Sequence, residues 1–129
     1  MKALAMITAI SGFMAVALGA FGAHALRAIA PPEMLAIWQT AMQYQMFHAL
    51  ILMCIVIAGS RTPNKLLCIA GWMFVVGTVL FSGSLYTVVI TGIKALGMIT
   101  PIGGVLFLGG WLVLAFAMVK FVAAEQAES

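Results

Sequence analysis

The sequence has very few charged residues and no aspartate. Of its 129 residues, 7% are charged and 65% are hydrophobic, and the charges are six Lys or Arg against three Glu. An ordinary soluble domain is about 45–50% apolar and about 25% charged, so this chain has too little polar surface to cover a water-soluble fold. The composition excludes a soluble enzyme, a disordered tail and a nucleic-acid-binding module. It leaves a small integral membrane protein.

The basic residues are too dispersed to form a surface for nucleic acid. They stand singly between long apolar runs, where the positive-inside rule expects them. They are Lys2, Arg27, Arg61, Lys65, Lys94 and Lys120. We therefore expect no nucleic-acid partner. Two cysteines, Cys54 and Cys68, are too few for a disulfide framework and are expected to pack as small apolar residues.

Four uncharged stretches account for most of the chain. Each is long enough to cross a hydrocarbon core of about 30 Å, which needs about 20 helical residues, and none alternates as barrel strands do. We predict one transmembrane domain over residues 1–129, with an all-α fold that is an integral membrane four-helix bundle. The expected helices cover approximately residues 3–24, 34–59, 65–90 and 101–122.

The orientation follows from the basic residues beside the helix ends. Lys2, the turn from Arg61 to Lys65 and Lys120 share one side of the membrane, and Arg27 and Lys94 share the other. Four basic residues against two place both termini in the cytoplasm. The first apolar run resembles a signal peptide, but its length of about 20 residues exceeds the usual 7–15, so we expect an uncleaved helix.

Glycine and proline mark helix packing and helix starts. Gly103 and Gly110 stand seven apart, as in a seam where two helix backbones approach closely. The segment Pro31-Pro32-Glu33 predicts the start of the second helix, because proline suits the first helical position and a carboxylate suits the first turn. The indole of Trp38 is expected at the membrane interface.

The second span holds most of the polar residues expected within the membrane. Thr40, Tyr44 and His48 are four apart and form one ridge, and Gln39 and Gln43 form the neighbouring ridge. This face is predicted to point toward the bundle interior or toward water. Gln45 lies off it.

Helical rise places several polar residues near the outer membrane surface. At about 1.5 Å per residue, His48 lies near the midplane and most of the others near the outer face. The candidate cluster is His24, Gln39, Gln43, Tyr44, His48, Ser82, Ser84 and Tyr86. Such side chains either bond neighbouring helices or bind a ligand. Ser82 and Ser84 are expected to be back-bonded or interhelical.

No catalytic set is visible. There is no aspartate to orient a histidine, and Glu33, Glu125 and Glu128 lie near helix ends or in the tail. His24 and His48 are separated by about 15 Å along the membrane normal, which is too far for a shared metal unless the first helix is broken. We expect no enzymatic activity, no metal and no cofactor, and hydrogen-bonded structural histidines.

Four segments in order resemble a known family. They are GAFGAHAL at 19–26, WQTAMQYQMFHAL at 38–50, FSGSLY at 81–86 and ITPIGG at 99–104. This set is similar to the YgdD/YwdK group of bacterial inner-membrane proteins, the family of domain of unknown function 423. The resemblance spans essentially the whole chain. It implies a small multi-pass protein of the bacterial inner (plasma) membrane with no established biochemical activity.

Two hypotheses of function remain open. In the first, a non-enzymatic membrane protein uses the polar cluster to hold its helices together or to bind a lipid, a quinone or a partner helix. Membrane lipids and further copies of the chain are its expected partners, with an unidentified membrane protein as another candidate. The alternative is a small-solute channel or transporter with an outer-face polar vestibule, in which His48 is the switch.

Overall fold

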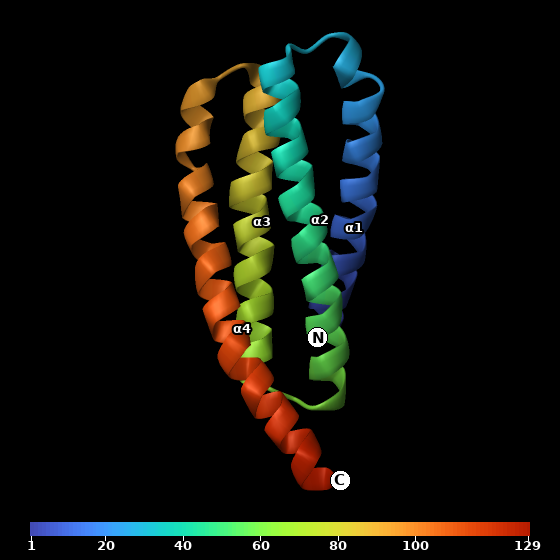
Figure 1. The fold of residues 1–129 in the computed structure, drawn as a ribbon, viewed down its shortest axis with the longest axis vertical. Coiled ribbons are helices and arrows are strands. Elements are labelled where there is room, and N and C mark those ends of the chain that lie inside the picture. Colours follow the sequence, from blue (N-terminus) through green and yellow to red (C-terminus); the bar gives the residue numbers. More distant parts are fainter.

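The chain folds into four long helices joined by short connections. The computed structural model describes residues 1–129. All four helices are long and apolar enough to cross a membrane, which confirms the predicted all-helical fold. They are α1 (Lys2–Ala23), α2 (Pro32–Arg61), α3 (Lys65–Thr91) and α4 (Thr100–Glu128), with the short 3-10 helices η1 (Leu26–Ala28) and η2 (Lys94–Met98) in two connections. Successive helices run antiparallel, so both termini lie toward the same end of the bundle (Figure 1).

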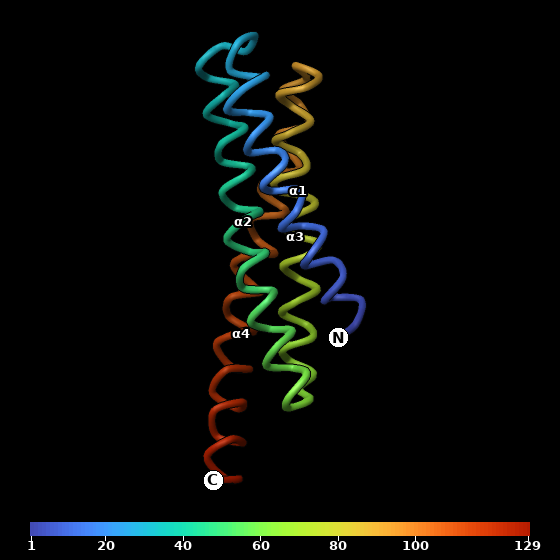
Figure 2. The backbone as a smooth tube through the Cα atoms, turned by 90° about the vertical axis from the view of Figure 1, so that its right-hand side faces the viewer, coloured from blue at the N-terminus to red at the C-terminus, as the bar shows by residue number.

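The helices pack mainly on their sequence neighbours. The strongest pairing is α3 with α4, followed by α2 with α3 and α1 with α2. By contrast, α1 contacts α3 only slightly, and it is tilted relative to α3 (Figure 2). Because α1 and α3 have little direct contact, side chains fill the space between them only in part.

Local chemistry accounts for the observed helix ends. Pro32 occupies the first turn of α2 after an extended Pro31, so this helix starts two residues before the predicted bound. The Asn64 side chain caps α3 by accepting a 2.9 Å hydrogen bond from the Leu66 N–H. Gly92 ends α3 with a φ of 72°, a left-handed conformation that favours glycine. The fourth helix runs beyond residue 122 to Glu128 and projects past the bundle (Figure 1).

A seam of glycines joins α3 to α4. A side chain at Gly110 would lie 2.6 Å from the Phe74 ring, and one at Gly77 would lie 2.8 Å from the Phe107 ring. At Gly103 it would collide with the backbone of Phe81. The two helices are antiparallel, so successive contacts move forward along α3 and backward along α4. At these contacts a glycine on one helix packs against a phenylalanine on the other. The predicted close approach at Gly103 and Gly110 is confirmed.

The buried core is concentrated at the end of the bundle that holds the termini. Leu52, Ile55, Leu67 and Phe74 are almost completely buried there, and Leu4 is the large side chain through which α1 joins them. The remaining length of α1 buries only small residues. Large apolar side chains are exposed on all four helices, as expected for a protein whose surroundings are lipid rather than water.

Candidate functional site

Two side chains of α2 bond the backbone of α1. The indole Nε1 of Trp38 donates a 2.8 Å hydrogen bond to the carbonyl of Leu18, and Nε2 of Gln45 donates a 3.1 Å hydrogen bond to the carbonyl of Ser11. The donors are seven residues apart, and so are the acceptors. Both bonds therefore lie along one helix–helix contact, separated by about two turns.

Tyr86 of α3 contacts both of these α2 side chains. Its hydroxyl donates a 2.7 Å hydrogen bond to Oε1 of Gln45, and its ring meets the Trp38 indole edge-on, with 4.6 Å between the ring centroids. Gln45 is 5% exposed and Trp38 is 2% exposed. Gly22 makes room for the indole, since a side chain there would lie 2.5 Å from Cδ1 of Trp38. Helices α1, α2 and α3 are thus connected by one buried group of polar and aromatic side chains.

His48 occupies a separate aromatic cage between α2, α3 and α4. Its ring stacks on Phe107 with 3.7 Å between centroids, and Phe74 meets it edge-on. Nδ1 lies 2.7 Å from the Tyr44 carbonyl, and Nε1 of Trp111 lies 3.3 Å from Nε2 of His48. A carbonyl only accepts and an indole N–H only donates, so Nδ1 carries the proton and Nε2 is unprotonated. The cage therefore holds a neutral imidazole with both nitrogens paired.

The two predicted serines bond within the bundle. The Ser82 hydroxyl donates a 2.7 Å hydrogen bond to the Ala41 carbonyl on α2. The Ser84 hydroxyl donates to the Phe81 carbonyl at 2.9 Å and lies 2.5 Å from the Thr100 hydroxyl at the start of α4. The expectation of back-bonded or interhelical serines is confirmed.

The remaining predicted residues lie on the surface. His24, Gln39 and Gln43 are exposed and make no side-chain hydrogen bond, and Tyr44 is 43% exposed with its ring against Phe81. The eight predicted residues therefore divide between the contact around Tyr86, the His48 cage, the two serine contacts and the surface.

Two residues have different surroundings from those predicted. Gln45 is buried and bonds two other helices, although it lies off the predicted polar face of the second span. The reason is that α2 has neighbours on more than one side. Trp38 was expected at the interface, but its indole is buried between helices because Leu18 offers it an acceptor there.

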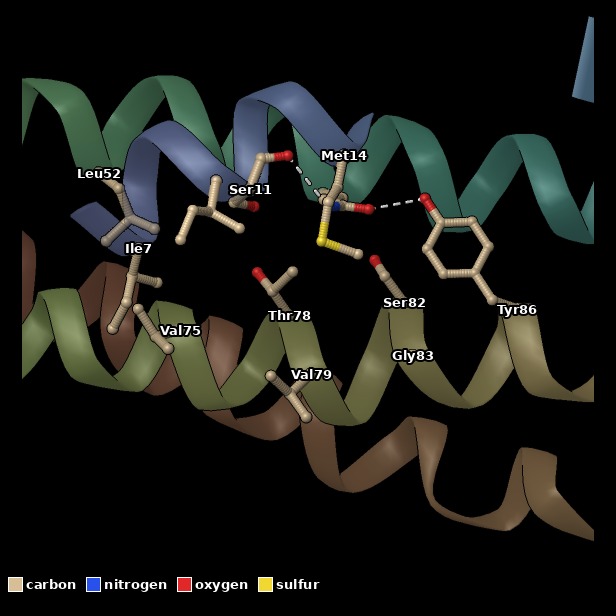
Figure 3. A pocket seen from close by; sticks show the side chains of 12 residues that line it. Ile7, Ser11, Met14, Leu52, Val75, Thr78, Val79, Ser82, Gly83 and Tyr86 are labelled. Atoms are coloured by element: carbon tan, nitrogen blue, oxygen red, sulfur yellow. Dashed lines mark hydrogen bonds between the residues drawn. The ribbon is translucent and has the colours of Figure 1, made fainter. Parts of the chain in front are cut away.

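A groove lies between α1 and α3, with α2 as its floor. Its cavity has a volume of about 280 Å³, and most of the side chains around it are apolar (Figure 3). One end is lined by Ile7, Leu52 and Val75, and the other by Gln45, Ser82 and Tyr86. Sequence reasoning missed this groove.

Four helices long and apolar enough to cross a membrane, joined by buried hydrogen bonds, are typical of a multi-pass membrane protein. The chain belongs to the family described as "Protein of unknown function (DUF423)", which matches residues 18–104. That range contains Trp38, Gln45, His48 and Tyr86.

Relatives match nearly the full chain. A UPF0382 membrane protein of Staphylococcus aureus (strain bovine RF122) is 48% identical over 94% of this chain and 98% of its own length. The UPF0382 membrane protein YwdK of Bacillus subtilis (strain 168) is 42% identical over 95% of this chain and all of its own length. No solved structure matches the chain. These relatives are named as membrane proteins, and their names give no biochemical role.

Proposed function

We propose that this is a non-enzymatic protein of the bacterial inner (plasma) membrane that binds a lipid-like molecule in the groove between α1 and α3. The observation that carries the proposal is the cavity itself, about 280 Å³ within the membrane-spanning part of the bundle and enclosed mainly by apolar side chains. Ligand sites are typically concave and mostly apolar, with a few polar groups that fix orientation.

The length of the groove suits one apolar chain. On α3 it extends from Val75 to Tyr86, which corresponds to about 16 Å at the helical rise. This is close to half of a hydrocarbon core of about 30 Å, so the groove matches the depth of a single leaflet. An acyl or prenyl chain has both the length and the apolar surface that such a groove accommodates.

Transport is the weaker proposal because most of the buried polar side chains already bond groups within the bundle. Both ring nitrogens of His48 are paired inside its cage, and Gln45, Ser82 and Tyr86 bond other helices. A water-filled path needs polar groups free to replace the hydration of a solute. The same pairing supports a protein without catalytic activity, since it leaves neither nitrogen of the buried His48 free to act as a base.

The proposal also includes cytoplasmic termini and association of several copies of the chain. The distribution of basic residues supports cytoplasmic termini. The exposed apolar faces of the helices support contacts with lipid or with further copies of the chain, so we propose a homo-oligomer.

Native mass spectrometry of protein released from its membrane in mild detergent tests the proposal. We expect one retained lipid-like adduct per chain. Gly83 lines the groove, and a side chain there would meet no atom within 4 Å, so Gly83→Leu adds a large side chain at the edge of the groove without a collision. This variant should lose the adduct.

Gly12→Leu is the matched control for Gly83→Leu. Gly12 also has open space at its Cβ but does not line the groove. It adds the same side chain to a helix, and it should keep the adduct. Equal adduct occupancy in Gly83→Leu, Gly12→Leu and the unmodified protein would contradict binding in the groove. The same spectra report the number of chains per complex.

A further inference from the structure

Two hydroxyl groups face the groove from opposite walls. Ser11 of α1 and Thr78 of α3 both line the cavity, and their hydroxyls turn toward the space between the two helices (Figure 3). Neither hydroxyl makes a hydrogen bond, and Oγ1 of Thr78 is a buried polar atom without a partner. The other polar side chains of the groove, Gln45, Ser82 and Tyr86, are all paired.

The unpaired state of Thr78 is unusual for a threonine in this bundle. The other threonines within the long helices, away from their first residues, donate to the carbonyl four residues earlier, as at Thr8 (2.7 Å), Thr40 (3.1 Å) and Thr87 (2.7 Å). A polar group without a partner in an apolar medium costs roughly 2–7 kcal/mol. A ligand oxygen that accepts a hydrogen bond from Thr78 would remove this cost.

The two hydroxyls lie near the middle of the membrane. Thr78 is the central residue of α3 (Lys65–Thr91), and Ser11 is close to the centre of α1 (Lys2–Ala23). The ester groups of phospholipids lie about 15 Å away, at the edge of the hydrocarbon core. The depth of Ser11 and Thr78 therefore favours a molecule that carries its oxygen into the bilayer interior.

On the basis of the proposed groove, we propose that its occupant is a membrane quinone with a prenyl chain, one carbonyl oxygen of which accepts hydrogen bonds from Thr78 and Ser11. A carbonyl oxygen has two lone pairs and accepts from two donors at once. A quinone bears its carbonyls on an otherwise apolar, uncharged body, so it resides at the midplane without a headgroup at the surface. The prenyl chain occupies the apolar length of the groove. The proposal concerns binding and includes no electron transfer.

Binding of a synthetic quinone to the purified full-length protein in detergent tests this. The probe is a benzoquinone with one short prenyl tail and ¹³C at its carbonyls, and the comparison compound is the hydrocarbon of the same shape without oxygen. We expect the quinone to bind more tightly than the hydrocarbon, and its carbonyl band in the infrared difference spectrum to shift to lower frequency. Gly83→Leu should prevent binding of both compounds.

Thr78→Val and Ser11→Ala remove the two donors. Because each hydroxyl is unpaired in the bundle, the fold should survive both changes. A typical hydrogen bond contributes about 1 kcal/mol, so each variant should weaken quinone binding about fivefold and leave hydrocarbon binding unchanged. In Thr78→Val the carbonyl band should also return toward its unbonded position. Thr40→Val is the matched control, because Thr40 bonds its own helix on α2 and lies outside the groove.

Three results would overturn the quinone proposal, and they separate it from the groove proposal. If quinone and hydrocarbon bind equally and Gly83→Leu blocks both, the groove binds apolar molecules without using its hydroxyls. If Thr78→Val leaves the affinity and the carbonyl band unchanged, Thr78 is not the donor. If neither compound binds while native mass spectra still show an adduct that Gly83→Leu loses, the occupant belongs to another chemical class.

Discussion

Tyr86 on α3 fixes the Gln45 side chain on α2 through a 2.7 Å hydrogen bond to Oε1, and Nε2 of the same amide bonds the α1 backbone at Ser11. The position of α1 therefore depends on α3 even though the two helices have little direct contact. The bonds also form one end of the groove, which α1 and α3 enclose. A change at Tyr86 is expected to affect how firmly α1 is held.

Replacing Tyr86 by phenylalanine should lower the stability of the bundle. The ring contact with Trp38 is kept, but Oε1 of Gln45 loses its donor while the residue is 5% exposed. Interhelical hydrogen bonds in membranes contribute about 0.6 kcal/mol on average and up to about 1.7. We expect a loss near 1 kcal/mol, measured by thermal unfolding in detergent. Tyr44→Phe is the control, because the Tyr44 hydroxyl makes no hydrogen bond and the residue is 43% exposed. Equal melting temperatures for both variants would show that the Tyr86–Gln45 bond adds nothing.

Alanine at Gly103 should disrupt the seam between α3 and α4. Its methyl group would collide with the backbone of Phe81, which cannot move aside as a flexible side chain does. Overpacking of this kind costs about 1–3 kcal/mol, and we expect a lower melting temperature in detergent. Gly104→Ala is the neighbouring control, since its nearest contact is 3.9 Å away, on the Phe81 ring. If Gly103→Ala and Gly104→Ala have the same melting temperature, α3 and α4 do not approach each other as closely at Gly103 as described above.

His48 should be a neutral imidazole with its proton on Nδ1. The Tyr44 carbonyl accepts from Nδ1, and the Trp111 indole donates to Nε2, so only this tautomer satisfies both bonds. Nitrogen-15 solid-state NMR of the protein in bilayers distinguishes the two tautomers and the imidazolium. Trp111→Phe should shift the Nε2 resonance, because it removes the only donor to that atom. Trp72→Phe should leave the resonance unchanged, since Trp72 is 42% exposed and makes no hydrogen bond. A protonated Nε2 in the unmodified protein would contradict the assignment.

The sequence predicts the helices well because the signal for each is a long apolar run. Proline and glycine mark several ends, and the spacing of Gly103 and Gly110 predicts the seam, since a close backbone approach needs small residues at a repeated position. The far end of α4 was missed because residues 123–128 are helical without being apolar enough to count as membrane-spanning.

The polar contacts were predicted less well. A face drawn from residues four apart assumes that α2 has one interior side, and it omits Gln45, which bonds both α1 and α3. Spacing within one helix contains no information about the neighbours on each side. The groove could not be predicted at all, because it depends on how α1 is tilted against α3. Thr78 has no sequence feature that distinguishes it from the threonines that bond their own helix.

The proposed orientation makes a prediction that is independent of any ligand. Four antiparallel spans place both termini on one side of the membrane, and the basic residues beside that side outnumber those on the other. A green fluorescent protein fused after Ser129 should therefore fluoresce in bacterial cells, and alkaline phosphatase at the same point should be inactive. Alkaline phosphatase fused within η2 (Lys94–Met98), on the opposite side, should be active and serves as the matched control. Active phosphatase at Ser129 together with inactive phosphatase in η2 would reverse the orientation and would mean that Arg27 and Lys94, rather than Lys2 and Lys120, face the cytoplasm.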